Sequence, residues 1–284
     1  MSATPTDGGF SGPTDCQALT ARRLKACSEL LEAVVGWLGE VVPSPQNPWL
    51  LQRQTELILR SIQSMQGSVL LAGRGLWIPT YALARMLIED AAVAHWLAVH
   101  PEPDVLEARW RRHLLVTHLS DIETQEDLGL DLDPETIRWQ SQQDAAELAR
   151  ITDPGKLARA HWTGKSPEKL AAGAAARAAP SRADWDGRAR ELVRATTRFA
   201  PLASLGIHHS PSASQNWCAP ASELLPDALR FAWRAFSLHA ILGLEELAPT
   251  HLDDLARRIE DQAAAFSQPP ADHPGRLSNT RSAF

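Results

Sequence analysis

The sequence predicts an all-α protein: a single bundle of roughly eight to ten helices around a nearly all-apolar central helix. Apolar residues recur at helical spacing along most of the chain, as on the buried face of a helix. Pro, Asn, Asp and Gly stand where such segments would begin or end. No run alternates polar residues with β-branched apolar ones, so we predict no sheet.

The first two predicted helices are marked at their ends. The first follows Asp15 and stops at Pro43. Asn47 then supplies a cap and Pro48 a first-turn proline for the second, which ends at Gly73. Two long helices therefore open the chain.

The third predicted helix, residues 79–99, is apolar around nearly its whole circumference. A helix without a polar face is stable in water only when other helices surround it. We therefore place this helix at the centre of the bundle.

Later helices are marked in the same way. Asp104 begins a fourth, which should end near Gly129, and Pro167 opens an alanine-rich helix that Pro180 closes. Pro226 lies near the start of a late apolar helix.

The chain of 284 residues is long enough for one large core. We predict one domain, residues 14–267, between a disordered N-terminus (1–13) and a disordered tail (268–284) that is rich in polar residues, Pro and Ser.

The net charge of −6 gives no overall attraction to nucleic acid. No run of about 18 apolar residues is present, which predicts no membrane span. The N-terminus lacks the basic and apolar regions of a signal peptide, and Cys16, Cys27 and Cys218 have no CxxC spacing. We read them as free thiols and expect a cytoplasmic protein.

Arg85 and Glu89 stand one helical turn apart on the predicted central helix. An Arg and a Glu in a core must be paired, and removing one would then cost about 3–5 kcal/mol. The pair is either a structural contact that fixes helix register or the polar floor of a ligand pocket.

His208, His209 and Ser210 form the densest polar loop between apolar helices. They could supply acid–base groups to a site, or simply cap a helix. We expect one of the two imidazoles to lie within reach of Glu89, with Trp96 or Trp162 closing one side. No HExxH motif or zinc-type Cys/His set occurs, so no metal ligands are predicted, and the cofactor is left open.

Arg112 and His118 are separated by five residues on the predicted fourth helix, with His113 between them. This spacing resembles the R-x(4–6)-H pattern of HEPN-type ribonucleases, which are helical and cut RNA without a metal. The resemblance implies that Arg112 holds phosphate and His118 transfers protons, in a cleft that a homodimer would form. The alternative is a solvated basic helix face.

Three segments together resemble a bacterial all-helical family known only as a domain of unknown function. They are LARMLIE at 83–89 followed by Trp96, WTGKS at 162–166, and Ser204 with His208. The family patterns are R-x-x-x-E, W-x-G-x-S and Y-x-x-x-S-x-x-x-H, and this chain has no tyrosine ahead of Ser204. The resemblance implies a helical fold with a polar pocket, and no particular reaction.

Three functional hypotheses stay open. The first is a pocket of Arg85, Glu89, His208 and His209 that binds or transforms a small polar or anionic ligand, in bacterial specialised metabolism. The second is the ribonuclease or toxin, for which RNA is the less favoured partner of the two. The third is an interaction scaffold without chemistry.

Overall fold

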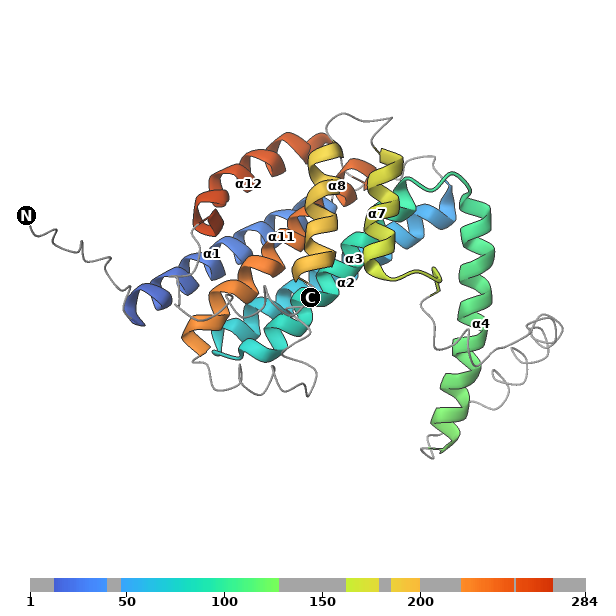
Figure 1. Ribbon diagram of the computed structural model, residues 1–284, viewed down its shortest axis with the longest axis horizontal. Helices are drawn as coiled ribbons and strands as arrows, with labels where there is room; N and C mark the ends of the chain where they lie inside the picture. Colours follow the sequence, from blue (N-terminus) through green and yellow to red (C-terminus); the bar gives the residue numbers. More distant parts are fainter. Residues whose placement is uncertain are drawn as a thin grey trace, which may run out of the picture.

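The computed structural model describes residues 13–39, 47–127, 162–178, 185–199, 221–247 and 249–267. These residues form eight α-helices packed together and contain no strand, which confirms the all-α prediction (Figure 1). The helices are α1 (Pro13–Leu38), α2 (Pro48–Gly73), α3 (Trp77–Ala98), α4 (Pro103–Asp127), α7 (Pro167–Ala178), α8 (Trp185–Arg194), α11 (Ala221–Leu247) and α12 (Leu252–Ser267). A π-helical turn, η1 (Ala195–Phe199), follows α8, and a 3₁₀ turn, η2 (Pro249–His251), precedes α12.

The helix ends follow local chemistry. The Asn47 side chain accepts hydrogen bonds from the backbone N–H groups of Trp49, at 3.0 Å, and Leu50, at 3.2 Å, as a helix cap does. Beyond α2, Gly75 has a positive φ of 76°, which a glycine adopts without strain. Pro13, which the sequence placed in the disordered N-terminus, is instead the first residue of α1, a position that suits proline.

α3 lies at the centre of the arrangement, as predicted. It packs against α2, α11 and α7, while α1 and α12 cover the other side of α11 (Figure 1). Its apolar side chains are shared between the two larger core clusters. Three polar residues of α3 are nevertheless buried, namely Thr80, Asp90 and His95.

α11 begins at Ala221, so Pro226 lies near the start of the helix as predicted, but inside it. Proline removes one hydrogen bond of the second turn. Leu225, the residue before this proline, is buried. The apolar face of the helix therefore begins ahead of Pro226, and its packing stabilises the helix despite the proline.

Arg23 of α1 joins three helices. Its side chain is fully buried, its Nε donates to the Ala265 carbonyl at 3.0 Å, and its Nη1 donates to the Pro226 carbonyl at 2.7 Å. Its guanidinium also lies 5.7 Å from the Phe266 ring centroid. Burial lowers the pKa of Arg23 to about 10, so it stays charged at neutral pH. Arg23 therefore links α1 to α11 and α12.

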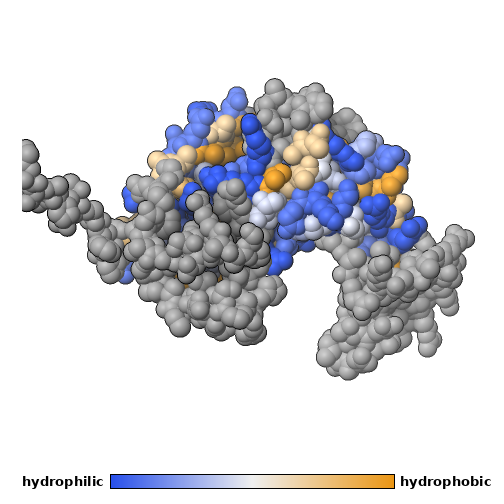
Figure 2. Space-filling view, viewed as in Figure 1, coloured by the Kyte–Doolittle hydropathy of each residue, from blue (hydrophilic) through white to orange (hydrophobic). Residues whose placement is uncertain are grey.

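None of the described helices combines the length and the hydropathy that crossing a membrane requires. Cys16 and Cys27 are free thiols, and burial raises the pKa of Cys27 well above its usual range. On the face in Figure 2, the coloured surface is mostly hydrophilic with small apolar patches. Residues 1–12, residues 268–284 and Cys218 lie outside the described residues.

Candidate functional site

Arg85 and Glu89 form the predicted pair, but at the edge of the core. The Arg85 Nε donates to the Glu89 Oε1 at 2.8 Å, and the two side chains remain 33% and 35% exposed. Met86 beside them is 42% exposed, because this side of α3 faces outward. The expectation of a core pair therefore needs correction: the buried carboxylate of α3 is Asp90, which is 1% exposed.

Asp90 holds Arg60 of α2. The Arg60 Nε donates to Asp90 Oδ2 at 2.9 Å, and its Nη2 donates to Oδ1. The Asp90 side chain is 2% exposed, whereas that of Arg60 is 55% exposed. Burial raises the pKa of Asp90, and the hydrogen bond from Arg60 opposes that rise. One side of the guanidinium is thus fixed from within, and the other reaches the surface.

A layer of neutral polar groups lies behind this pair, between α2, α3 and α11. Ser61 Oγ and His239 Nδ1 share a hydrogen bond of 2.6 Å, and the Gln54 amide donates to the Ala94 carbonyl at 3.0 Å. Burial, together with the positive charge of the nearby His95 and Arg60, lowers the pKa of His239 to about 3. His239 is therefore neutral at physiological pH.

A cavity of about 470 Å³ opens in front of Arg60, between α2, α3 and α4. It is lined by apolar, aromatic and charged side chains: Arg53, Glu56, Leu57, Arg60, Val93, Leu97, Trp110, His113, Thr117 and Trp162. On each helix the lining residues recur at helical spacing, so they lie on one face of that helix, and this face borders the cavity.

Three indole rings and two cations form a row along this cavity. The Arg53 guanidinium lies 4.6 Å from the Trp110 ring centroid. Trp110 and Trp162 have centroids 6.3 Å apart, and Trp162 and Trp96 have centroids 6.2 Å apart. The Lys165 ammonium lies 5.3 Å from the Trp96 ring. Trp162 thus lines this cavity, whereas Trp96 is fully buried and supports it from behind.

A second cavity of about 390 Å³ continues along α3. Its lining includes Glu89 and Val93 of α3, Lys165, and Leu170 of α7. Val93 also lines the first cavity, so the two cavities are neighbours on one stripe of α3. We call the two cavities together the α3 groove. It brings Glu89 next to Gly164, Lys165 and Ser166.

The turn that carries Trp162 is fixed locally. Gly164 has a positive φ of 68°, which favours glycine at this position. The Thr163 hydroxyl accepts from the Lys165 N–H at 3.2 Å, and Arg109 of α4 donates to the Thr163 carbonyl at 3.2 Å. The turn therefore presents Trp162 and Lys165 from a defined backbone.

Arg112 is exposed on α4, whereas His113 beside it is partly buried and lines the α3 groove. The backbone of His118 belongs to α4, but its side chain lies outside the described residues. The ribonuclease hypothesis therefore stays a prediction. So does the expected approach of His208 or His209 to Glu89, because these residues and Ser210 also lie outside the described part of the chain.

Sequence reasoning did not identify Arg53, Arg60, Asp90 or Trp110. The available signal was their spacing: Arg53 and Arg60 are seven residues apart on α2, and Trp110 precedes His113 by three on α4. Such stripes can be found in a sequence. Which stripe faces which helix depends on the packing.

Among the described residues, no group of three or more His, Cys, Asp or Glu side chains gathers as metal ligands would. In comparisons with known proteins, no protein-family model, curated protein or solved structure matches this chain. Both family resemblances stay predictions, and a function is inferred from the geometry of the α3 groove.

Proposed function

We propose that the α3 groove binds a small planar ligand with a carboxylate or a comparable acceptor group. The observation that carries this proposal is Arg60, which the buried Asp90 fixes at a cavity walled by Trp110 and Trp162. The proposal keeps the small polar or anionic ligand expected from the sequence and changes the residues that hold it.

Arg60 is suited to an anionic group. A guanidinium has five N–H donors in a planar fork, and Asp90 accepts from only one edge of it. The remaining donors are on the exposed part of the side chain and match the two oxygens of a carboxylate. Because Asp90 already orients Arg60, a ligand would lose little additional side-chain freedom on binding.

The walls of the groove favour a flat ligand. Trp110 and Trp162 offer large aromatic surface, and Leu57 and Leu97 add apolar contact. A volume of about 470 Å³ lies within the range of small-molecule sites, in which apolar walls stand beside polar groups that orient the ligand.

The second cavity would set specificity at the other end of the ligand. Glu89 and Lys165 face it with opposite charges. A chemical step on the bound ligand would depend on His113, whose ring lines the first cavity and whose type transfers protons near neutral pH. Binding is the primary proposal, and an acid–base step is its extension.

The proposed setting is the bacterial cytoplasm, with a role in specialised metabolism. This proposal is supported by the three cysteines, which we read as free thiols, and by the resemblance to the bacterial helical family. His208 and His209 are expected to approach the Glu89 end of the groove.

The test is titration calorimetry with 2-naphthoate and its uncharged analogue 2-naphthamide. We expect saturable binding of 2-naphthoate, with the amide weaker, because only the carboxylate is negatively charged and offers Arg60 two acceptor oxygens. Trp110→Leu should weaken binding about tenfold, since it removes one aromatic wall.

The matched control is Trp37→Leu, which changes a tryptophan of α1 that does not line the groove. It should leave the affinity for 2-naphthoate unchanged. Equal losses in both variants, or no saturable binding by the wild type, would refute the proposal.

A further inference from the structure

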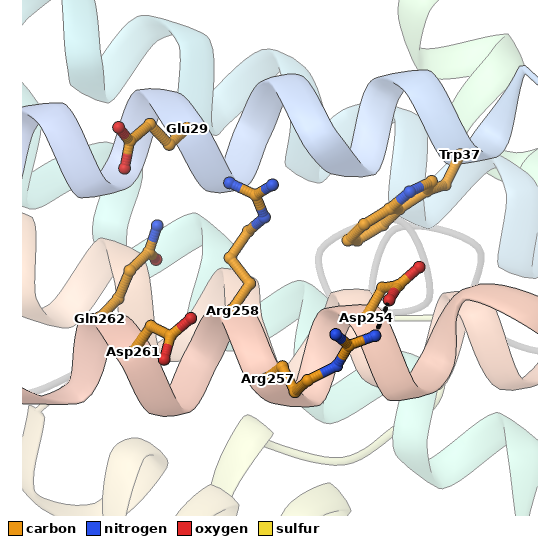
Figure 3. A pocket seen from close by; sticks show the side chains of 7 residues that line it. All are labelled: Glu29, Trp37, Asp254, Arg257, Arg258, Asp261 and Gln262. Carbon is orange, nitrogen blue, oxygen red and sulfur yellow. Dashed lines mark hydrogen bonds and ion pairs between the residues drawn. The ribbon is translucent and has the colours of Figure 1, made fainter.

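A second groove lies between α1 and α12, away from α4 (Figures 1 and 3). It has a volume of about 470 Å³ and is lined by Glu29 and Trp37 of α1 and by Arg258, Asp261 and Gln262 of α12. It shares no lining residue with the α3 groove. Anything inferred for it is therefore independent of the function proposed above.

Two adjacent arginines of α12 behave differently here. Arg257 bonds to Asp254 at the rim, and its side chain is 73% exposed. Arg258 is partly buried and extends across the groove toward α1 (Figure 3). Arg258 forms no hydrogen bond or ion pair with any residue that the structure describes, and the same holds for Asp261. A cation and a carboxylate thus border one groove without neutralising each other.

The other walls are held from behind. Trp37 stacks on His251 of η2, with ring centroids 5.6 Å apart and planes 13° apart. The Gln262 Oε1 accepts from the Trp233 indole N–H at 2.9 Å, which leaves the Gln262 amide NH₂ available to donate. The groove therefore has an aromatic wall and a polar wall of fixed orientation.

The charges select the kind of ligand. Asp254 already bonds to Arg257, and Glu29 already lies 3.7 Å from Lys25, so Arg258 and Asp261 are the lining charges left without a partner among the described residues. A simple anion meets Asp261. A simple cation meets the unpaired Arg258. A zwitterion satisfies both charges at once, since each of its groups faces a partner of opposite sign.

We propose that the α1–α12 groove is a second ligand site, and that it binds an aromatic α-amino acid in its zwitterionic form. The ligand carboxylate pairs with Arg258, its ammonium group with Asp261, and its ring packs on Trp37. The Gln262 amide donates to the carboxylate.

The experiment is titration calorimetry of the full chain with L-phenylalanine, N-acetyl-L-phenylalanine and L-phenylalanine amide. The first carries both charges, the second lacks the ammonium charge, and the third lacks the carboxylate. We expect saturable binding of L-phenylalanine, and affinities at least about tenfold lower for the two analogues, because each loses one charge-assisted contact.

Arg258→Gln should weaken L-phenylalanine binding about tenfold or more, and Asp261→Asn should weaken it in the same direction. Arg22→Gln is the control, because Arg22 is an exposed arginine of α1 that does not line the groove; it should leave binding unchanged. Trp110→Leu should also leave it unchanged, which separates this site from the α3 groove.

The proposal is overturned if L-phenylalanine shows no saturable binding. It is also overturned if both singly charged analogues bind as well as L-phenylalanine, or if Arg22→Gln weakens binding as much as Arg258→Gln does. Should Arg258→Gln not fold, Asp261→Asn and the two analogues decide the question.

Discussion

Arg23 and Arg60 are both anchored inside the bundle, but they leave different donors available. The Arg23 side chain is fully buried, and two of its donors bond to backbone carbonyls of α11 and α12. Arg60 is bonded along one edge to the buried Asp90, while more than half of its side chain is exposed at a cavity. Arg23 therefore joins helices, and Arg60 is available to a ligand.

The difference shows that burial alone does not identify a functional residue. A charged group whose donors form hydrogen bonds inside the protein contributes to the stability of the fold. A charged group that is fixed on one side and open on the other is pre-organised for binding. Variants of the two regions should therefore separate stability from affinity.

The largest expected effect is on the Arg23 side. Arg23→Ala should lower the free energy of unfolding by about 3–5 kcal/mol, because it leaves two buried carbonyls without their donor and opens a cavity. Urea unfolding would measure this, with the exposed Arg22→Ala as the control, expected within about 0.5 kcal/mol of the wild type. A loss below about 1 kcal/mol for Arg23→Ala would contradict its linking role.

The interior behind Arg60 should show a pH dependence. The pKa of His239 is lowered to about 3 in the folded protein, so between that value and the unfolded pKa near 6.5 the unfolded chain binds the extra proton. Stability should thus fall with pH below about 6.5, by about 1.4 kcal/mol per unit, or about 2.7 kcal/mol at pH 4.5.

Urea unfolding at several pH values checks this effect, and His239→Asn should remove that part of the slope. The carboxylates common to both proteins cancel in the comparison. If wild type and variant have the same slope between pH 4.5 and 6.5, His239 is not held neutral by burial.

Asp90→Asn should affect both stability and affinity. Losing the charged acceptor of Arg60 should cost about 1–2 kcal/mol in urea unfolding, since the exposed Arg60 can turn to water. Affinity for 2-naphthoate should fall about tenfold, because Arg60 is no longer oriented. Arg23→Ala, measured where it is folded, should bind 2-naphthoate normally. Unchanged binding by Asp90→Asn would remove Arg60 from the site.

The smallest effect is expected at the pair that the sequence had favoured. Glu89→Ala should cost less than about 1 kcal/mol, because Arg85 and Glu89 are an i, i+4 pair about one-third exposed to water. The cost of 3–5 kcal/mol expected for a core pair no longer applies. A change in the urea midpoint that corresponds to more than 2 kcal/mol would restore the core interpretation.

The helices themselves were determined by the sequence. Asn47 followed by Pro48 specifies the start of α2, and Pro167 that of α7, because caps and first-turn prolines act within one turn of the chain. The apolar circumference of α3 was enough to place it at the centre. Pro226 lies near the start of α11 as predicted, but the sequence did not show that the helix begins at Ala221, because a proline inside a helix is tolerated only when packing supports it.

The candidate site was decided by the tertiary structure. Glu89 and Asp90 are adjacent in the sequence, yet Glu89 is at the edge of the core and Asp90 is inside it. Successive residues of a helix point in directions about 100° apart, and only the packing determines which direction faces another helix. In the same way, Arg60 lies 30 residues from Asp90, and Trp110 is far from Trp162 along the chain. The local sequence pattern determined the helices and the residues on each of their faces. The packing of the helices against one another determined which faces are in contact.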